Sequence, residues 1–140
     1  MSPEKKKKVA RLLGLPVTDN TTEESVYNQV DNLLKQTEFK NGKFSGLDPV
    51  KVFNQFADMK ENLLNIKDLV KQALHHSIYR MKPNGKIYEG EYEVAIDEDE
   101  LVKMLADDDN QDTLLTLEGK LKSKKIAAII ITLPLSRAAR

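Results

Sequence analysis

Residues 48–76 read DPVKVFNQFADMKENLLNIKDLVKQALHH, and their pattern decides the expected fold. Apolar residues recur at alternating spacings of four and three, which places them along one side of an α-helix. This stripe consists of Val52, Phe56, Met59, Leu63, Ile66, Val70 and Ala73. Phe53, Leu69 and Leu74 lie beside the stripe and make it wider than a two-stranded coiled-coil seam. The segment therefore predicts one long amphipathic helix, which another helix or a sheet must cover.

Two shorter helices are expected before this segment. Ser2 followed by Pro3 is a typical start for the first helix, and Gly14 and the proline after it end that helix. Thr21 and Glu24 have the spacing of a capping box, which starts the second helix. The two helices together predict an N-terminal helical hairpin.

The loop at 38–47 marks the expected division of the chain, because Gly42 and Gly46 interrupt any regular pattern there. The helical hairpin is assigned to residues 1–37. The long helix and everything after it are assigned to residues 48–140. We expect the two parts to pack as one compact domain.

After the long helix the apolar pattern changes from a helical period to an alternating one. Residues 77–82 and 86–96 alternate on either side of the turn Pro83-Asn84-Gly85, which predicts a β-hairpin. Residues 98–106 predict a short helix, whose acidic first turn suits the helix dipole.

Residues 113–133 fit two patterns. A helical heptad is formed by Leu114, Leu117, Leu121, Ala128, Ile131 and Leu135 and is interrupted by Lys124. Gly119 and the isoleucines of 126–133 favour strands instead, and we predict two strands joined by a turn near Ser123. The expected fold is therefore α+β: an N-terminal helical hairpin, one long amphipathic helix, and a small, mostly antiparallel sheet of about four strands.

The composition is that of a globular protein. Hydrophobic residues make up 40% and charged residues 31% of the 140 residues, which suits one domain with an ordinary core. Cysteine is absent, so disulfides and thiolate metal sites are excluded. No apolar segment follows the basic N-terminus as in a secretory signal, and the longest apolar run, 126–133, is too short to span a membrane. We expect a cytoplasmic protein without a membrane partner.

The net charge is zero, but the charges are segregated along the chain. Residues 1–13 have a balance of +4, residues 97–112 of −7, and residues 118–140 of +5. Basic ends and an acidic middle permit electrostatic contact between copies of the chain. The candidate partner-binding residues are Lys5, Lys6, Lys7, Lys8, Arg11, Asp107, Asp108, Asp109, Lys124, Lys125, Arg137 and Arg140.

The sequence contains no convincing metal-binding or catalytic motif. Counting Asp107 as the first position of a calcium loop puts Glu118 at the twelfth, but Asp112 occupies the sixth, where the sharp turn requires glycine. His75 and His76 are neighbours on a helix and cannot bind one ion together. No phosphate-binding loop or nucleophile motif is present. We predict a protein that is not an enzyme and has no cofactor and no metal.

Nucleic-acid binding is the alternative function. The basic termini could neutralise phosphates, and helices followed by a hairpin with Lys82 and Lys86 at its tip are similar to a winged helix. The overall pI of 6.7 and the absence of aromatic residues among the basic runs argue against this reading.

One stretch resembles a known group of proteins. The run Ala10-Arg11-Leu12-Leu13-Gly14-Leu15-Pro16, followed by Thr21-Thr22-Glu23-Glu24 and a helix, resembles short helical modules of tailed-bacteriophage head-assembly proteins. The resemblance covers residues 9–34 and implies a structural role in a virion or its assembly. No protease residues can be carried over. We therefore predict a structural or assembly protein, a subunit that contacts other protein subunits, including copies of itself.

Overall fold

The computed structural model describes the backbone of residues 1–132 and side chains up to residue 127. The fold is α+β, as predicted, with six α-helices and one three-stranded antiparallel sheet in the described residues, one strand fewer than expected. The elements are α1 (Pro3–Leu12), α2 (Glu23–Leu34), α3 (Pro49–Ala57), α4 (Glu61–His75), β1 (Arg80–Met81), β2 (Ile87–Glu89), β3 (Tyr92–Ala95), α5 (Glu98–Ala106), a short 3₁₀ helix η1 (Asp108–Asn110) and α6 (Gln111–Thr132).

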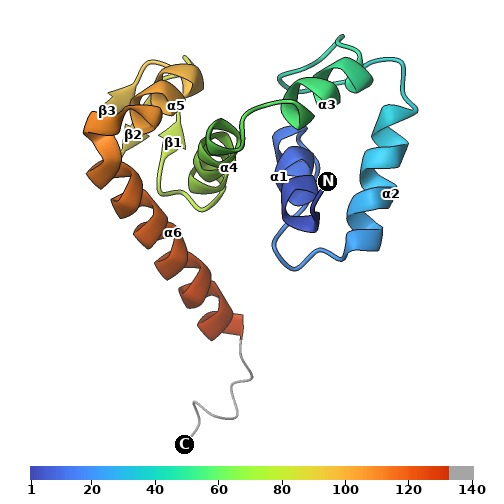
Figure 1. The fold of residues 1–140 in the computed structure, drawn as a ribbon. Coiled ribbons are helices and arrows are strands. Elements are labelled where there is room, and N and C mark those ends of the chain that lie inside the picture. Colours follow the sequence, from blue (N-terminus) through green and yellow to red (C-terminus); the bar gives the residue numbers. More distant parts are fainter. Residues whose placement is uncertain (133–140) are drawn as a thin grey trace, which may run out of the picture. The chain divides into compact units, whose positions relative to one another are not determined.

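The chain divides into two compact units, Met1–Lys71 and Gln72–Arg140. The division falls inside α4, whereas the sequence analysis placed it in the loop at 38–47. The first unit contains α1, α2 and α3 (Figure 1). The second unit contains the sheet, α5 and α6.

The predicted helical hairpin is confirmed. The side chain of Ser2 accepts a hydrogen bond from the Lys5 amide at the start of α1, and Gly14 ends this helix with a φ of 91°. The start of α2 differs by one residue from the prediction, because the capping residue is Thr22, which accepts from the Ser25 amide. The Thr21 hydroxyl instead accepts from the Thr18 amide within the preceding turn.

The single long helix predicted for 48–76 is wrong. The segment forms two helices, α3 and α4, and Asp58 to Lys60 separate them. The side chain of Asp48 caps α3, as its position before Pro49 requires. The separating residues include neither proline nor glycine, so the repeat continued through them and concealed the interruption.

The interruption changes which residues face the core. Leu64 is fully buried, whereas Leu63, the residue in phase with the predicted stripe, is only half-buried. The rest of the stripe stays buried in α4, at Ile66, Val70 and Ala73. A heptad drawn across two helices therefore identifies most of the core but fails at the first turn after the break.

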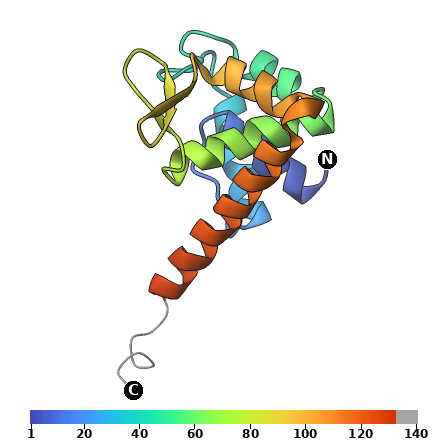
Figure 2. The same ribbon diagram turned by 90° about the vertical axis from the view of Figure 1, so that its left-hand side faces the viewer.

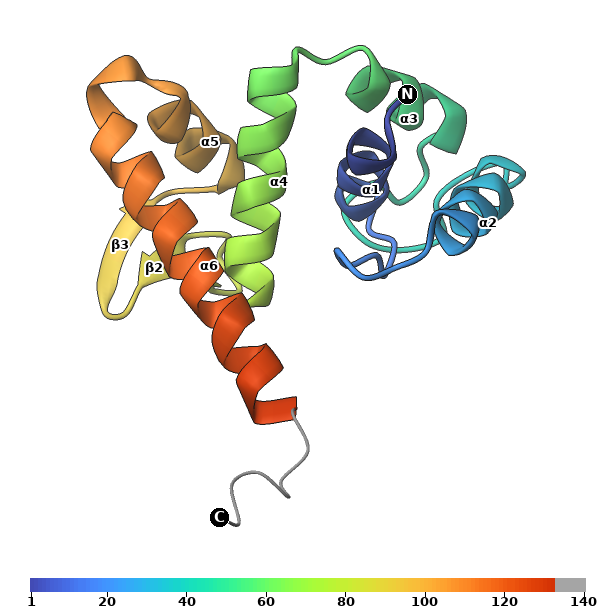
Figure 3. The ribbon, with the colours of Figure 1, turned by 60° about the horizontal axis from the view of Figure 1, so that its bottom comes forward.

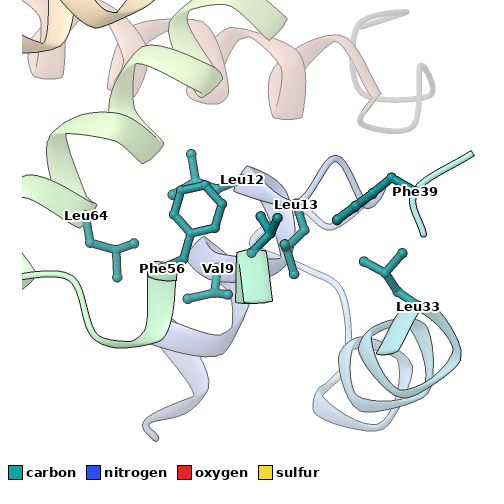
Figure 4. Packing of buried hydrophobic residues seen from close by; sticks show 8 residues of the cluster. Val9, Leu12, Leu13, Leu33, Phe39, Phe56 and Leu64 are labelled. Carbon is teal, nitrogen blue, oxygen red and sulfur yellow. The ribbon is translucent and has the colours of Figure 1, made fainter. Parts of the chain in front are cut away.

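The main core of the first unit is centred on α1. Val9, Leu12 and Leu13 lie between Leu64 on one side and Leu33 on the other (Figure 4). Rings add to the cluster from the loop at 38–47 and from α3: the centroid of Phe44 is 5.4 Å from that of Phe39 and 5.9 Å from that of Phe56. The loop that the sequence marked as a boundary therefore packs into the core of this unit.

The predicted hairpin exists, but its second arm contains a further turn. β1 pairs antiparallel with β2, with Arg80 opposite Tyr88, and β2 pairs antiparallel with β3 (Figure 2). Gly85 and Gly90 have φ values of 86° and 62°, which glycine adopts without strain, and each lies in one of the two turns. The alternation of tyrosines and glutamates over 86–96 concealed the second turn.

The short helix at 98–106 is confirmed as α5. Asp97 caps it by accepting from the Glu100 amide, and the carboxylate of Glu100 accepts from the Ile96 amide in return. Leu101 and Leu105 are buried, while Met104 is exposed. α5 contacts β3 on one side and α6 on the other.

The two strands predicted within 113–133 are wrong, because residues up to Thr132 form the helix α6 (Figure 3). The heptad that began at Leu114 was the correct pattern, and its members Leu117 and Leu121 are buried. Good helix formers dominate the first fifteen residues of the segment, and they outweigh one glycine and a β-branched end. Leu133 and the heptad position Leu135 lie outside the described residues.

Candidate functional site

The start of α6 is built by the acidic loop. Asp107 ends α5 and its carboxylate accepts a hydrogen bond from the Asp109 amide, which begins η1. Asn110 donates from its side chain to the carbonyl oxygen of Met104, at 2.9 Å. Asp107, Asp108 and Asp109 are exposed, so the corner between α5 and α6 presents three carboxylates.

One face of α6 is covered within its own unit. Leu117 and Leu121, one helical turn apart, are 1% and 4% exposed. The ammonium of Lys120 forms an ion pair with Glu89 of β2 and so ties the helix to the sheet. This half of α6 belongs to the core of the second unit.

The opposite face of α6 is exposed and carries two large apolar side chains. Leu115 is 62% exposed and Ile126 is 51% exposed. Gly119 and Lys122 lie between them and are also exposed. The four residues follow one another at spacings of four, three and four, so they form one stripe along the helix. We call these four residues the outer stripe. A helix that is apolar on two faces is normally covered on both.

The second half of α6 extends past α5 and the three strands of its unit (Figure 1, Figure 3). Residues 122–127 are exposed except for Lys125, which is half-buried. The helix then continues through Ala128-Ile129-Ile130-Ile131-Thr132. The chain thus places a strongly apolar sequence at the end of a helix that its own unit leaves largely uncovered up to residue 127.

Gly119 is the least expected residue of the outer stripe. Glycine inside a helix costs roughly 1 kcal/mol relative to alanine. Gly119 does not have a positive φ, and a Cβ added there would meet nothing within 4 Å. The fold of the described residues therefore does not explain why a side chain is absent at this position.

Most of the predicted basic residues of α1 hold the first unit together. Lys5 donates to the carbonyl oxygen of Ala57 at 2.8 Å, and Lys7 donates to that of Asp19 at 2.9 Å. Lys8 donates to Oδ1 of Asn65.

Arg11 forms an ion pair with the buried Asp68 and a longer contact with Asp19. Lys6 is the one residue of the run 5–8 that is exposed. The basic run thus forms internal contacts more than it forms a surface.

The remaining predicted residues do not form one site. Asp107 to Asp109 lie before α6, and Lys124 and Lys125 lie in its second half, so both groups belong to the second unit and α1 to the first. Arg137 and Arg140 lie outside the described residues. The sequence analysis missed Leu115, Gly119 and Ile126 as a shared face, because it assigned their segment to strands. A helical assignment of 113–133 would have placed them on one side of the helix.

The cations of the hairpin also have intramolecular partners. The ammonium of Lys82 lies 4.0 Å from the centroid of the Tyr88 ring, and Lys86 forms an ion pair with Glu93 at 3.2 Å. The hydrogen bonds and charge of Glu93 raise the pKa of Lys86. Nucleic-acid binding stays a prediction, and gel-shift titrations at several salt concentrations would test it.

A pocket of about 300 Å³ opens where α6 meets the sheet. Its polar lining includes Glu89, Lys120, Thr113 and Thr116, and Tyr79 forms part of its wall. Lys120 and Glu89 form an ion pair within this lining, and the carboxylate of Asp112 also lines the pocket. In the described residues no group of three or more histidine or acidic side chains is placed to hold a metal ion.

None of the helices within residues 1–132 is both long and apolar enough to cross a membrane. No protein family model, no curated protein and no solved structure matches this chain.

Proposed function

We propose that this chain is a structural subunit of a protein assembly, and that the outer stripe of α6 is its principal contact with a neighbouring subunit. The observation that carries the proposal is the exposure of Leu115 and Ile126 on one side of a helix whose other side is buried. Because both side chains are already partly covered, burying the rest of them contributes on the order of 2–3 kcal/mol to association. Both residues lie on one face of the same helix, so a single neighbouring helix can cover both of them.

The charge distribution adds to the proposal. Carboxylates of Asp108, Asp109 and Asp112 surround the start of α6, while Lys122 and Lys124 lie in its second half. Charges arranged in this way set the register and orientation of a contact more than its strength. The helix thus combines an apolar surface with flanking charges, the usual arrangement of a specific protein interface.

The resemblance of residues 9–34 to head-assembly modules of tailed bacteriophages makes a virion the assembly that we propose. The chain would then occupy the host cytoplasm before assembly and the particle afterwards. Its helical first unit, with an internally bonded α1, would serve as a second module of the subunit.

The test compares the mass of the purified chain in solution with that of a variant carrying Leu115→Gln and Ile126→Gln. We expect concentration-dependent assembly of the unmodified chain by light scattering, and a shift towards the monomer in the variant. Met81→Gln is the matched control, because Met81 is an exposed apolar residue of the same unit outside α6. A chain that stays monomeric and retains no co-purifying protein contradicts the proposal.

A further inference from the structure

We infer that α6 pairs with the α6 of a second copy of this chain, in antiparallel orientation, about a two-fold axis that passes between residues 120 and 121. The inference rests on the proposed function and names the neighbouring subunit. A contact of this kind is self-complementary, since every residue pair occurs twice across the axis.

The outer stripe has the spacing that such a pair requires. Its residues 115, 119, 122 and 126 are placed symmetrically about the axis. Leu115 therefore faces Ile126 of the second copy, and Gly119 faces Lys122 of the second copy. The two exposed apolar residues of each stripe cover each other at both ends of the contact.

Gly119 supplies an independent argument for a close helix neighbour. Its missing side chain leaves open space on the outer side of the helix. A small residue at a helix contact lets two backbones approach, and it also gives the stem of a facing lysine room to pass. The cost of glycine within α6 is then offset by a contact that alanine or a larger residue would obstruct.

The charges distinguish the antiparallel from the parallel orientation. In an antiparallel pair the acidic starts of the two helices, at Asp108, Asp109 and Asp112, lie at opposite ends of the contact and do not face each other. Glu118 lies within reach of Lys122 of the second copy, because the two positions are on the same flank of the stripe. A parallel pair would instead set Lys122 against Lys122 and acidic start against acidic start, which is repulsive.

A second copy also fits these charges better than a lipid surface does. An anionic membrane would attract Lys122 but repel Glu118 and the carboxylates at the start of the same helix. Lys122 moreover interrupts the apolar stripe between Leu115 and Ile126, where a lipid-facing helix would carry an apolar residue. A second copy of the chain supplies both the carboxylate that Lys122 requires and the ammonium that Glu118 requires.

The absence of cysteine from the sequence makes the orientation directly testable by disulfide formation. Leu115→Cys and Ile126→Cys are prepared separately, one of them with an added mass tag, and mixed in a glutathione redox buffer. In the antiparallel pair residue 115 lies next to residue 126 of the second copy. Two copies of residue 115 are eleven positions apart along the axis, or about 16 Å, too far for a disulfide.

We expect the mixture to give the mixed disulfide dimer in more than roughly tenfold excess over the dimers that each variant forms alone. Gln36→Cys, an exposed position on the other unit, is mixed with Leu115→Cys as the control for random collision. Light scattering of the unmodified chain accompanies the cross-linking.

Three results would overturn the inference. Disulfides between two copies of residue 115 would show a parallel pair. Assembly without disulfides at either position would show that α6 is not the contact. Both results are compatible with the proposed assembly role. A monomer that binds anionic vesicles would contradict the pairing and the assembly role together.

Discussion

Arg11 of α1 and Asp68 of α4 form a two-pronged ion pair, in which Nε lies 2.8 Å from Oδ1 and Nη2 lies 2.8 Å from Oδ2. The Asp68 side chain is 3% exposed and that of Arg11 is 12% exposed. One turn earlier on both helices, Lys8 donates to Asn65. Two polar contacts therefore connect α1 and α4, and in both of them α1 supplies the donor. Burial lowers the pKa of Arg11, but the hydrogen bonds and charges of Asp68 and Asp19 outweigh it and raise the pKa above its ordinary value.

We expect Asp68→Ala to lower the free energy of unfolding by about 2–4 kcal/mol, because it leaves the guanidinium of Arg11 largely buried without its main partner. Urea denaturation followed by circular dichroism measures the change. Asp19→Asn is the control, since Asp19 is exposed and its contact with Arg11 is longer, and it should cost under about 0.5 kcal/mol. Equal decreases in the free energy of unfolding of both variants would show that the buried ion pair stabilises the fold no more than the exposed contact does.

The lysine run of α1 offers a second comparison within one helix. The ammonium of Lys5 donates a hydrogen bond to the carbonyl oxygen of Ala57, the last residue of α3. This oxygen lies in the last turn of the helix and has no partner within α3. Lys5→Met should therefore cost about 1 kcal/mol of unfolding free energy, and Lys6→Met close to nothing, because Lys6 is exposed. Thermal denaturation of the two variants side by side measures the difference. Identical melting temperatures would contradict a structural role for Lys5.

Tyr79 gives the chain a predicted sensitivity to alkaline pH. Its side chain is buried, and this burial, followed by the negative charge of Glu89, raises the pKa of its hydroxyl above the ordinary value. In the unfolded chain the hydroxyl ionises at its ordinary pKa, so the unfolded state loses its proton first as the pH rises. Stability is therefore unaffected below the ordinary pKa of tyrosine and decreases above it.

Urea denaturation at a series of pH values checks this expectation. Tyr79→Phe should remove part of the decrease above the ordinary tyrosine pKa and leave the pH dependence at neutral pH unchanged. Tyr27→Phe is the control, because Tyr27 is 63% exposed. A decrease that is identical in all three proteins would place its origin elsewhere.

Helix caps and tight turns depend on neighbouring residues, whereas helix breaks and the choice between strand and helix depend on tertiary packing. Caps at Ser2 and Asp97 and the turn around Gly85 were predictable, because each depends on a few neighbouring residues. The break at Asp58 was not, because the apolar repeat runs through it. The strand prediction over 113–133 failed since β-branched residues near the end of α6 outweighed the heptad that begins at Leu114.

The candidate site was the harder part to predict. A lysine run indicates a basic surface when only sequence is considered, yet Lys5, Lys7 and Lys8 are engaged by backbone and side-chain oxygens of the same unit. The outer stripe of α6 became visible only when the helix was known, because Leu115 and Ile126 share a face only at a helical period. Exposure, which no pattern in a single sequence gives directly, then distinguished the outer face from the buried one.

Gly119→Ala should move stability and association in opposite directions. Alanine stabilises the helix of an isolated chain by about 0.5–1 kcal/mol relative to glycine. Among the described residues nothing lies within 4 Å of the position that the new methyl group would take. In the antiparallel pair the same methyl group intrudes into the contact and should weaken it by about 1–3 kcal/mol. Thermal denaturation at low protein concentration measures the first effect, and light scattering across a dilution series measures the second. An alanine variant that is more stable and associates as strongly as the unmodified chain would show that no second backbone approaches α6 at this position.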